Sequence, residues 1–141
     1  PSSELLEHIW DSRETERLPY QRGALMALSW ETVAAGRGTS LADAIADLID
    51  RGASQRTSGA AAELTDAAIR DALEEAVGPV FVQDLSDHIV QGNLIEPADL
   101  SLPGCLTINK TGEAPARFAL AEGADPAACR ATLVSSLHRG G

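Results

Sequence analysis

Hydrophobic positions in the N-terminal half of the chain recur every three or four residues, which is the spacing of amphipathic helices. One such stripe predicts a helix over residues 3–17. Pro19 is expected to end this helix, because proline lacks the amide donor that a helix interior needs. A second helix is predicted over residues 20–35, with Gly36 and Gly38 as its stop.

The third helical pattern begins after Ser40. Asp43 follows three residues later, and such a pair is typical of a capping box at a helix start. The apolar stripe that comes next is expected to end at Gly52. Residues 53–64 are mostly small and polar, so they predict a mobile loop after these three helices.

After that loop, helical spacing returns over residues 66–77. Thr65 is expected to cap the start of this helix, and Gly78 is expected to end it. Residues 80–82 are apolar and are compatible with a short strand. Residues 84–91 then predict another helix.

The C-terminal part predicts a β-hairpin followed by a closing helix. Residues 93–104 contain two prolines and are expected to be extended. Residues 105–108 and 116–120 read as two strands that a turn connects. Asp125 is expected to cap the last helix, which has a proline in its first position and stops at Gly140.

Together these elements predict a mainly helical α+β fold. An N-terminal three-helix segment precedes a smaller portion made of helices and the β-hairpin. A chain of 141 residues fits one domain and is long enough to bury a core. We therefore expect a single domain over residues 1–141, with a helical part at 1–52, the mobile loop at 53–64 and the mixed part at 65–141.

Charge narrows the choice of partners. The chain has 21 acidic and 11 basic residues, a net charge of −10, and this field repels phosphate backbones and anionic membranes. We expect neither a nucleic acid nor a membrane as partner. No apolar run approaches the ~18 residues that cross a bilayer, and no leader-like segment opens the chain. The scarcity of lysine and abundance of alanine favour a bacterial protein, expected to be soluble and cytoplasmic.

Acidic residues recur on helix faces, and this pattern carries the main functional hypothesis. Asp43, Asp47 and Asp50 are three or four residues apart, which places them on one face, as a metal cage or a solvated surface would require. The solvated surface is the simpler interpretation. With Trp10 or Trp30 nearby, this face is the candidate contact surface for a basic protein partner, in an adaptor, an immunity protein or an inhibitor. Packing of both tryptophans in the core is the first alternative.

A second set of residues supports an enzymatic alternative. Asp84 and His88 are four residues apart on a predicted helix, so the carboxylate could orient the imidazole toward a small metabolite. The nucleophile could be Ser86, Ser101 or Cys105, of which this alternative takes Cys105. No nucleophile motif surrounds it, and acid–base pairs at this spacing are common on exposed helices.

The remaining features add little chemistry. Cys105 and Cys129 are 24 residues apart, which matches no common metal-ligand spacing and implies no disulfide framework. Buried cysteines are the expectation. A chain ending in Gly140 and Gly141 also resembles the tail of a carrier or modifier protein, although glycine after a helix is an ordinary cap. No cofactor or metal is expected, and a homo-oligomer is left open.

Overall fold

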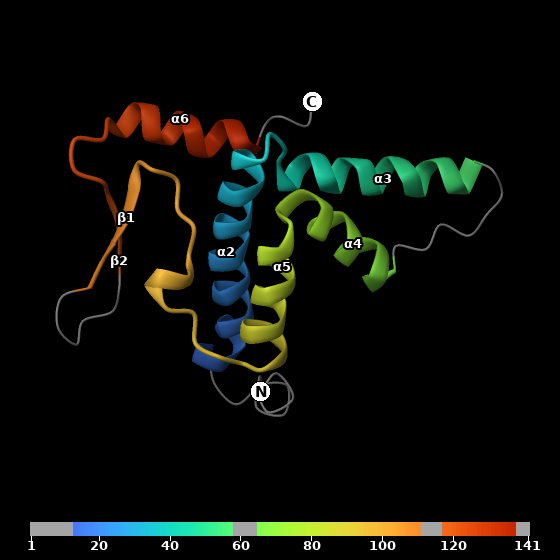
Figure 1. The fold of residues 1–141 in the computed structure, drawn as a ribbon, viewed down its shortest axis with the longest axis horizontal. Helices are drawn as coiled ribbons and strands as arrows, with labels where there is room; N and C mark the ends of the chain where they lie inside the picture. Colours follow the sequence, from blue (N-terminus) through green and yellow to red (C-terminus); the bar gives the residue numbers. More distant parts are fainter. Residues whose placement is uncertain (1–12, 58–64, 111–116, 138–141) are drawn as a thin grey trace.

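The computed structural model describes residues 13–57, 65–110 and 117–137, which form a mainly helical α+β fold (Figure 1). This confirms the predicted fold class. The helical elements are α2 (Arg13–Gly36), α3 (Leu41–Thr57), α4 (Asp66–Val77), α5 (Pro79–Asp84), the π-helical η1 (Leu85–Val90), the short 3-10 helix η2 (Pro97–Asp99) and α6 (Pro126–Leu137). The strands β1 (Leu106–Asn109) and β2 (Arg117–Leu120) pair antiparallel, as predicted.

The long helix α2 is the central element of the arrangement. α5 and η1 run beside it, while α3 leaves its C-terminal end and projects outward (Figure 1). α4 packs along α3 and leads back to α2 and α5. The hairpin lies on the other side of α2, and α6 lies across the C-terminal end of α2 (Figure 1). The fold therefore has a four-helix part with a smaller hairpin-and-helix part beside it.

The hydrophobic core lies where α2, α3, α4 and α5 meet. Small residues dominate its centre, so the helices approach one another closely. Its buried members are Ala44, Ala76, Val77 and Phe81, and the partly buried residues around them are Trp30, Val33, Leu41, Leu73 and Leu85. Burial of these side chains is what holds the helices together.

Proline does not divide the N-terminal helices. The prediction of separate helices on either side of Pro19 is wrong, because α2 runs without a break from Arg13 to Gly36. The φ of proline suits a helix, but a proline in this position removes one hydrogen bond and crowds the carbonyl four residues back, so packing further along α2 has to offset its cost. Downstream, Met26 and Ala34 are buried and provide the packing that sustains the helix. The predicted start of the first helix lies outside the described residues.

The turn between α2 and α3 follows the predicted chemistry. Gly38 adopts a φ of +82°, and the Thr39 amide donates to the Ala34 carbonyl at 3.1 Å, which closes the end of α2. Ser40 caps α3: its hydroxyl accepts from the Asp43 amide at 3.0 Å and donates to the Asp43 carboxylate at 2.7 Å. The capping pair is confirmed.

The end predicted for α3 is wrong. α3 continues through Gly52 to Thr57, so residues 53–57 are helical and not part of a mobile loop. Gly52 does not adopt the positive φ that would end a helix. The Thr57 hydroxyl also donates to the Ala53 carbonyl at 2.9 Å in the last turn. Residues 58–64 of the predicted loop lie outside the described residues.

The boundaries of α4 agree with the sequence. The Thr65 hydroxyl accepts from the Ala68 amide at 3.1 Å, which caps the start. Gly78 ends the helix with a φ of +84°. The Arg37 guanidinium donates to the Ala76 carbonyl at 3.1 Å, so a positive charge lies at the negative end of the α4 dipole. This contact ties the end of α2 to the end of α4.

The short strand considered for residues 80–82 is absent from the described fold. These residues belong to α5, which starts at Pro79, the helix position where a missing amide costs nothing. α5 continues directly into η1, so the helix predicted from residue 84 begins earlier. The Gln91 amide donates to the Ser86 carbonyl at 2.9 Å, five residues back, which is the wider turn of a π-helix.

A disulfide joins the hairpin to α6. Cys105, just before β1, is bonded to Cys129 on α6, with their Cα atoms 5.6 Å apart. The expectation that the cysteines form no disulfide is wrong, because the pairing depends on how α6 packs and not on sequence spacing. Asp125 caps α6 as predicted, accepting from the Ala128 amide at 3.0 Å.

Gly78 supplies a direct test of this packing. An added Cβ there would lie 2.9 Å from the Arg37 guanidinium, in a backbone conformation that side chains avoid. We expect Gly78→Ala to lower the free energy of unfolding by about 1–3 kcal/mol, measured by urea denaturation. Gly23→Ala, inside α2 and with nothing within 4 Å of the new Cβ, is the control and should add up to about 1 kcal/mol. Equal stability of the two variants would contradict this account.

Candidate functional site

The three aspartates predicted as a contact face have two different roles. Asp43 is half-buried and its carboxylate accepts from the Ser40 hydroxyl, so it supports the start of α3. Asp47 and Asp50 are exposed further along the same helix. Asp47 and Asp50 could therefore contact a partner without disturbing the cap of α3, whereas Asp43 could not.

Acidic residues of α4 extend this face, and sequence reasoning missed them. Asp71, Glu74 and Glu75 are all exposed. Glu75 and Asp47 line one cavity of about 230 Å³ between α4 and α3, together with Arg51. We call the exposed acids Asp47, Asp50, Asp71, Glu74 and Glu75 of these two helices the acidic surface; Glu75 lines the cavity with Asp47, whereas Glu74 lines a different hollow beside Arg37. The adjacent glutamates were visible in the sequence, but the antiparallel packing of α3 on α4 was not.

α3 also exposes large apolar side chains. Ile45 and Ile49 belong to the stripe that the sequence assigns to the core, yet they are 51% and 55% exposed. Ala44 and Leu48 are the buried members of that stripe. Because α3 projects from the fold, it presents both acidic and apolar side chains, a combination typical of protein contact surfaces.

Trp30 is partly buried and packs against the hydrophobic core. Its ring meets Phe81 edge to face, with centroids 4.8 Å apart. Its indole Nε1 donates to the Asp84 carboxylate at 2.9 Å, which joins α2 to α5. Asp84 is buried, so this hydrogen bond compensates part of the cost of removing the carboxylate from water. Trp10, the other proposed anchor, lies outside the described residues.

His88 is held in a separate structural network. Its side chain is buried, with Nδ1 3.3 Å from the Asn93 carbonyl oxygen and Nε2 3.9 Å from Asp99 Oδ2. The Arg22 guanidinium donates to the carbonyls of His88 and Asn93 and ties the end of η1 to α2. The Asp84 carboxylate instead accepts from the Trp30 indole. Asp84 and His88 therefore have different partners: Trp30 for Asp84, and Asn93 and Asp99 for His88.

The third residue of the enzymatic alternative has no free thiol. Cys105 is bonded to Cys129, so the expectation of a nucleophilic or free cysteine is wrong. Residues 140 and 141, the glycines of the carrier alternative, lie outside the described residues.

Within residues 13–57, 65–110 and 117–137, no group of three or more His, Cys, Asp or Glu side chains is placed to hold a metal ion. The described helices include none that is long and apolar enough to cross a membrane. Comparison of the chain with protein-family models, curated proteins and solved structures finds no match. The functional argument therefore depends on the geometry of this chain alone.

The bond between Trp30 and Asp84 makes a quantitative prediction. Trp30→Phe keeps an aromatic ring beside Phe81 but removes the donor, which leaves a buried carboxylate without this hydrogen bond. We expect the free energy of unfolding to fall by about 2–3 kcal/mol in urea denaturation. Tyr20→Phe, at an exposed position, is the control and should change it by less than about 0.5 kcal/mol. A loss of that small size for Trp30→Phe would show that the bond contributes little.

Proposed function

We propose that this chain is a non-catalytic interaction module that binds a basic protein through the acidic surface of α3 and α4. The observation that carries the proposal is the meeting of acidic side chains from two helices, with Asp47 and Glu75 lining one cavity. This arrangement suits a role as adaptor, immunity protein or inhibitor. The net charge of −10 adds a field that attracts a basic partner from a distance.

The exposed apolar residues of α3 support a protein as the partner. A surface with charge alone attracts many cations, whereas Ile45 and Ile49 offer area that a folded partner could cover. Charged groups around such apolar area would set orientation and association rate, and the apolar contacts would slow dissociation.

The enzymatic alternative has less support. Asp84 is bonded to Trp30, and Cys105 is bonded to Cys129, so neither is available to work with His88. A buried imidazole beside a backbone carbonyl is the ordinary environment of a structural histidine. We therefore keep the interaction module as the proposed function.

Charge reversal on α3 tests the proposal. We expect the double variant Asp47→Lys, Asp50→Lys to bind the partner at least about tenfold more weakly, because two attractive charges become repulsive. The partner would be captured from a lysate of the source cells on immobilised protein at low salt and identified. Its affinity for the wild type and the variant would then be measured with purified proteins at two salt concentrations.

Matched single variants control for net charge. Asp50→Lys and Glu122→Lys change the charge equally, but Glu122 is exposed between β2 and α6, away from α3 (Figure 1). We expect only Asp50→Lys to weaken binding substantially. If both variants weaken binding equally, or if neither does, the acidic surface is not the binding site.

The disulfide is relevant to the cellular compartment in which the protein acts. The sequence favoured a cytoplasmic protein, but the Cys105–Cys129 bond is more compatible with an oxidising environment, because disulfides are rare in reducing cytosol. We propose an oxidising compartment as the place of action. Alkylation of free thiols in intact source cells tests this, and we expect both cysteines to escape the reagent until a reductant is added. Labelling of both cysteines without reductant would support the cytoplasm instead.

A further inference from the structure

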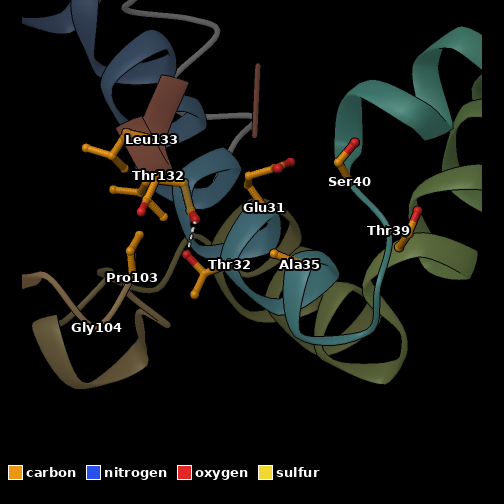
Figure 2. A pocket seen from close by; sticks show the side chains of 10 residues that line it. Glu31, Thr32, Ala35, Thr39, Ser40, Pro103, Gly104, Thr132 and Leu133 are labelled. Atoms are coloured by element: carbon orange, nitrogen blue, oxygen red, sulfur yellow. Dashed lines mark hydrogen bonds between the residues drawn. The ribbon is translucent and has the colours of Figure 1, made fainter. Parts of the chain in front are cut away.

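A second cavity lies on the other side of the turn between α2 and α3. It has a volume of about 210 Å³, and α2, the 103–104 loop and α6 form its walls. Figure 2 shows Glu31, Thr32 and Ala35 of α2 between Ser40 on one side and Pro103 and Leu133 on the other. Thr39 lines both this cavity and the cavity beside Asp47, so the two hollows share a wall.

Glu31 is the residue in this cavity whose carboxylate lacks a hydrogen bond on one of its two oxygens. Its Oε2 atom accepts from the Leu41 amide at 2.8 Å, which supports the first turn of α3. Its Oε1 atom is buried and has no hydrogen-bond partner, and it is the single buried side-chain polar atom in this state among the described residues. Such an atom is costly, and native proteins leave few of them without a function.

Three of the four hydroxyls that line the cavity use their donors within the protein. The hydroxyls of Thr32, Ser40 and Thr132 donate to the Leu28 carbonyl, the Asp43 carboxylate and the Ala128 carbonyl, respectively. The Thr32 oxygen therefore adds acceptor capacity to that of the Glu31 carboxylate. A ligand that matches this cavity must supply donors and a positive charge.

We propose that this cavity receives a lysine side chain of the basic partner, with its ammonium group on Glu31 Oε1. The aliphatic stem would lie against Leu28, Ala35, Pro103 and Leu133. An ammonium has three donors and no acceptor, which fits a site made of acceptors. Arginine fits less well, because its planar fork prefers two carboxylate oxygens and Oε2 is already engaged by Leu41.

A small side-chain rotation gives the ammonium access to the buried oxygen. The terminal torsion of glutamate is broad, and a small rotation brings Oε1 toward the cavity and moves Oε2 with it, within hydrogen-bond reach of the Leu41 amide. The inference rests on the proposed function, since the lysine is that of the partner bound at the acidic surface. The wall that Thr39 shares between the two cavities makes them parts of one continuous contact area.

Titration with side-chain analogues tests the site without the partner. The probes are the N-acetyl N-methylamides of lysine, arginine and norleucine, followed through the amide NMR signals of the full chain. We expect the lysine analogue alone to give saturable shifts at Thr32, Thr39 and Gly104, with a dissociation constant on the order of 1 mM. Equal shifts from norleucine, or lysine-dependent shifts only at other residues, would overturn the proposal.

Two variants define the role of Glu31. Glu31→Gln retains an oxygen that can accept from Leu41 but lacks the negative charge, so we expect at least about tenfold weaker binding of the lysine analogue. Glu122→Gln makes the same charge change outside both cavities and should leave binding unchanged. Unaltered binding by Glu31→Gln would contradict the assignment.

If Glu31→Gln does not fold stably, a substitution in the wall of the cavity tests the same proposal. Ala35→Leu narrows the cavity while leaving Glu31 in place, and it should also abolish the lysine-dependent shifts. Persistence of these shifts in a folded Ala35→Leu variant would overturn the proposal. The outcome is separable from that of the proposed function, because the analogue titration needs no partner and the charge reversals on α3 leave this cavity intact.

Discussion

The hydrogen bond from the Trp30 indole to the buried Asp84 carboxylate, set beside the apolar core that holds the helices together, fixes where α5 lies against α2. It joins the middle of α2 to the end of α5, and the ring of Phe81 packs against the same indole. Because α5 is held in this way, the turn at Gly78 between α4 and α5 sets the direction of α4 relative to the core. The Arg37 contact to the α4 carbonyls then fixes the other end of that turn. The positions of α3 and the acidic surface follow from these constraints.

This core is small, and its size shapes the surface. Alanines fill much of the centre, so the helices are close together and large apolar residues such as Ile45 and Ile49 remain outside it. The projecting α3 therefore combines exposed apolar area with the acidic surface. On the other side of the α2–α3 turn, the Glu31 cavity adds a site for one positive charge. In the complex that we propose, the two hollows that share Thr39 would give the partner both a broad electrostatic contact and one specific anchor point.

Local chemistry made parts of this fold predictable, and long-range packing made the rest unpredictable. Thr65 and Gly78 set the ends of α4 through bonds within a few residues, and the hairpin followed from two runs of strand-forming residues. Pro19 and Gly52 do not end their helices, because the φ of proline is compatible with a helix and Gly52 does not adopt the positive φ of a helix-ending glycine. The partners of Asp84 and Cys105 are 54 and 24 residues away, which no helical spacing can indicate. For the site, two of the three predicted aspartates are exposed, whereas the α4 acids and Glu31 required the packing of helices to be seen.

We propose that the α3–α4 side of the molecule is the face that binds the basic partner. Amide hydrogen exchange of the chain, measured alone and in complex with the captured basic partner, tests this most directly. We predict added protection along α3 and α4 and at the amide of Gly104, which lines the Glu31 cavity. Unchanged exchange along α3 and α4, with new protection confined to the hairpin or α6, would contradict it.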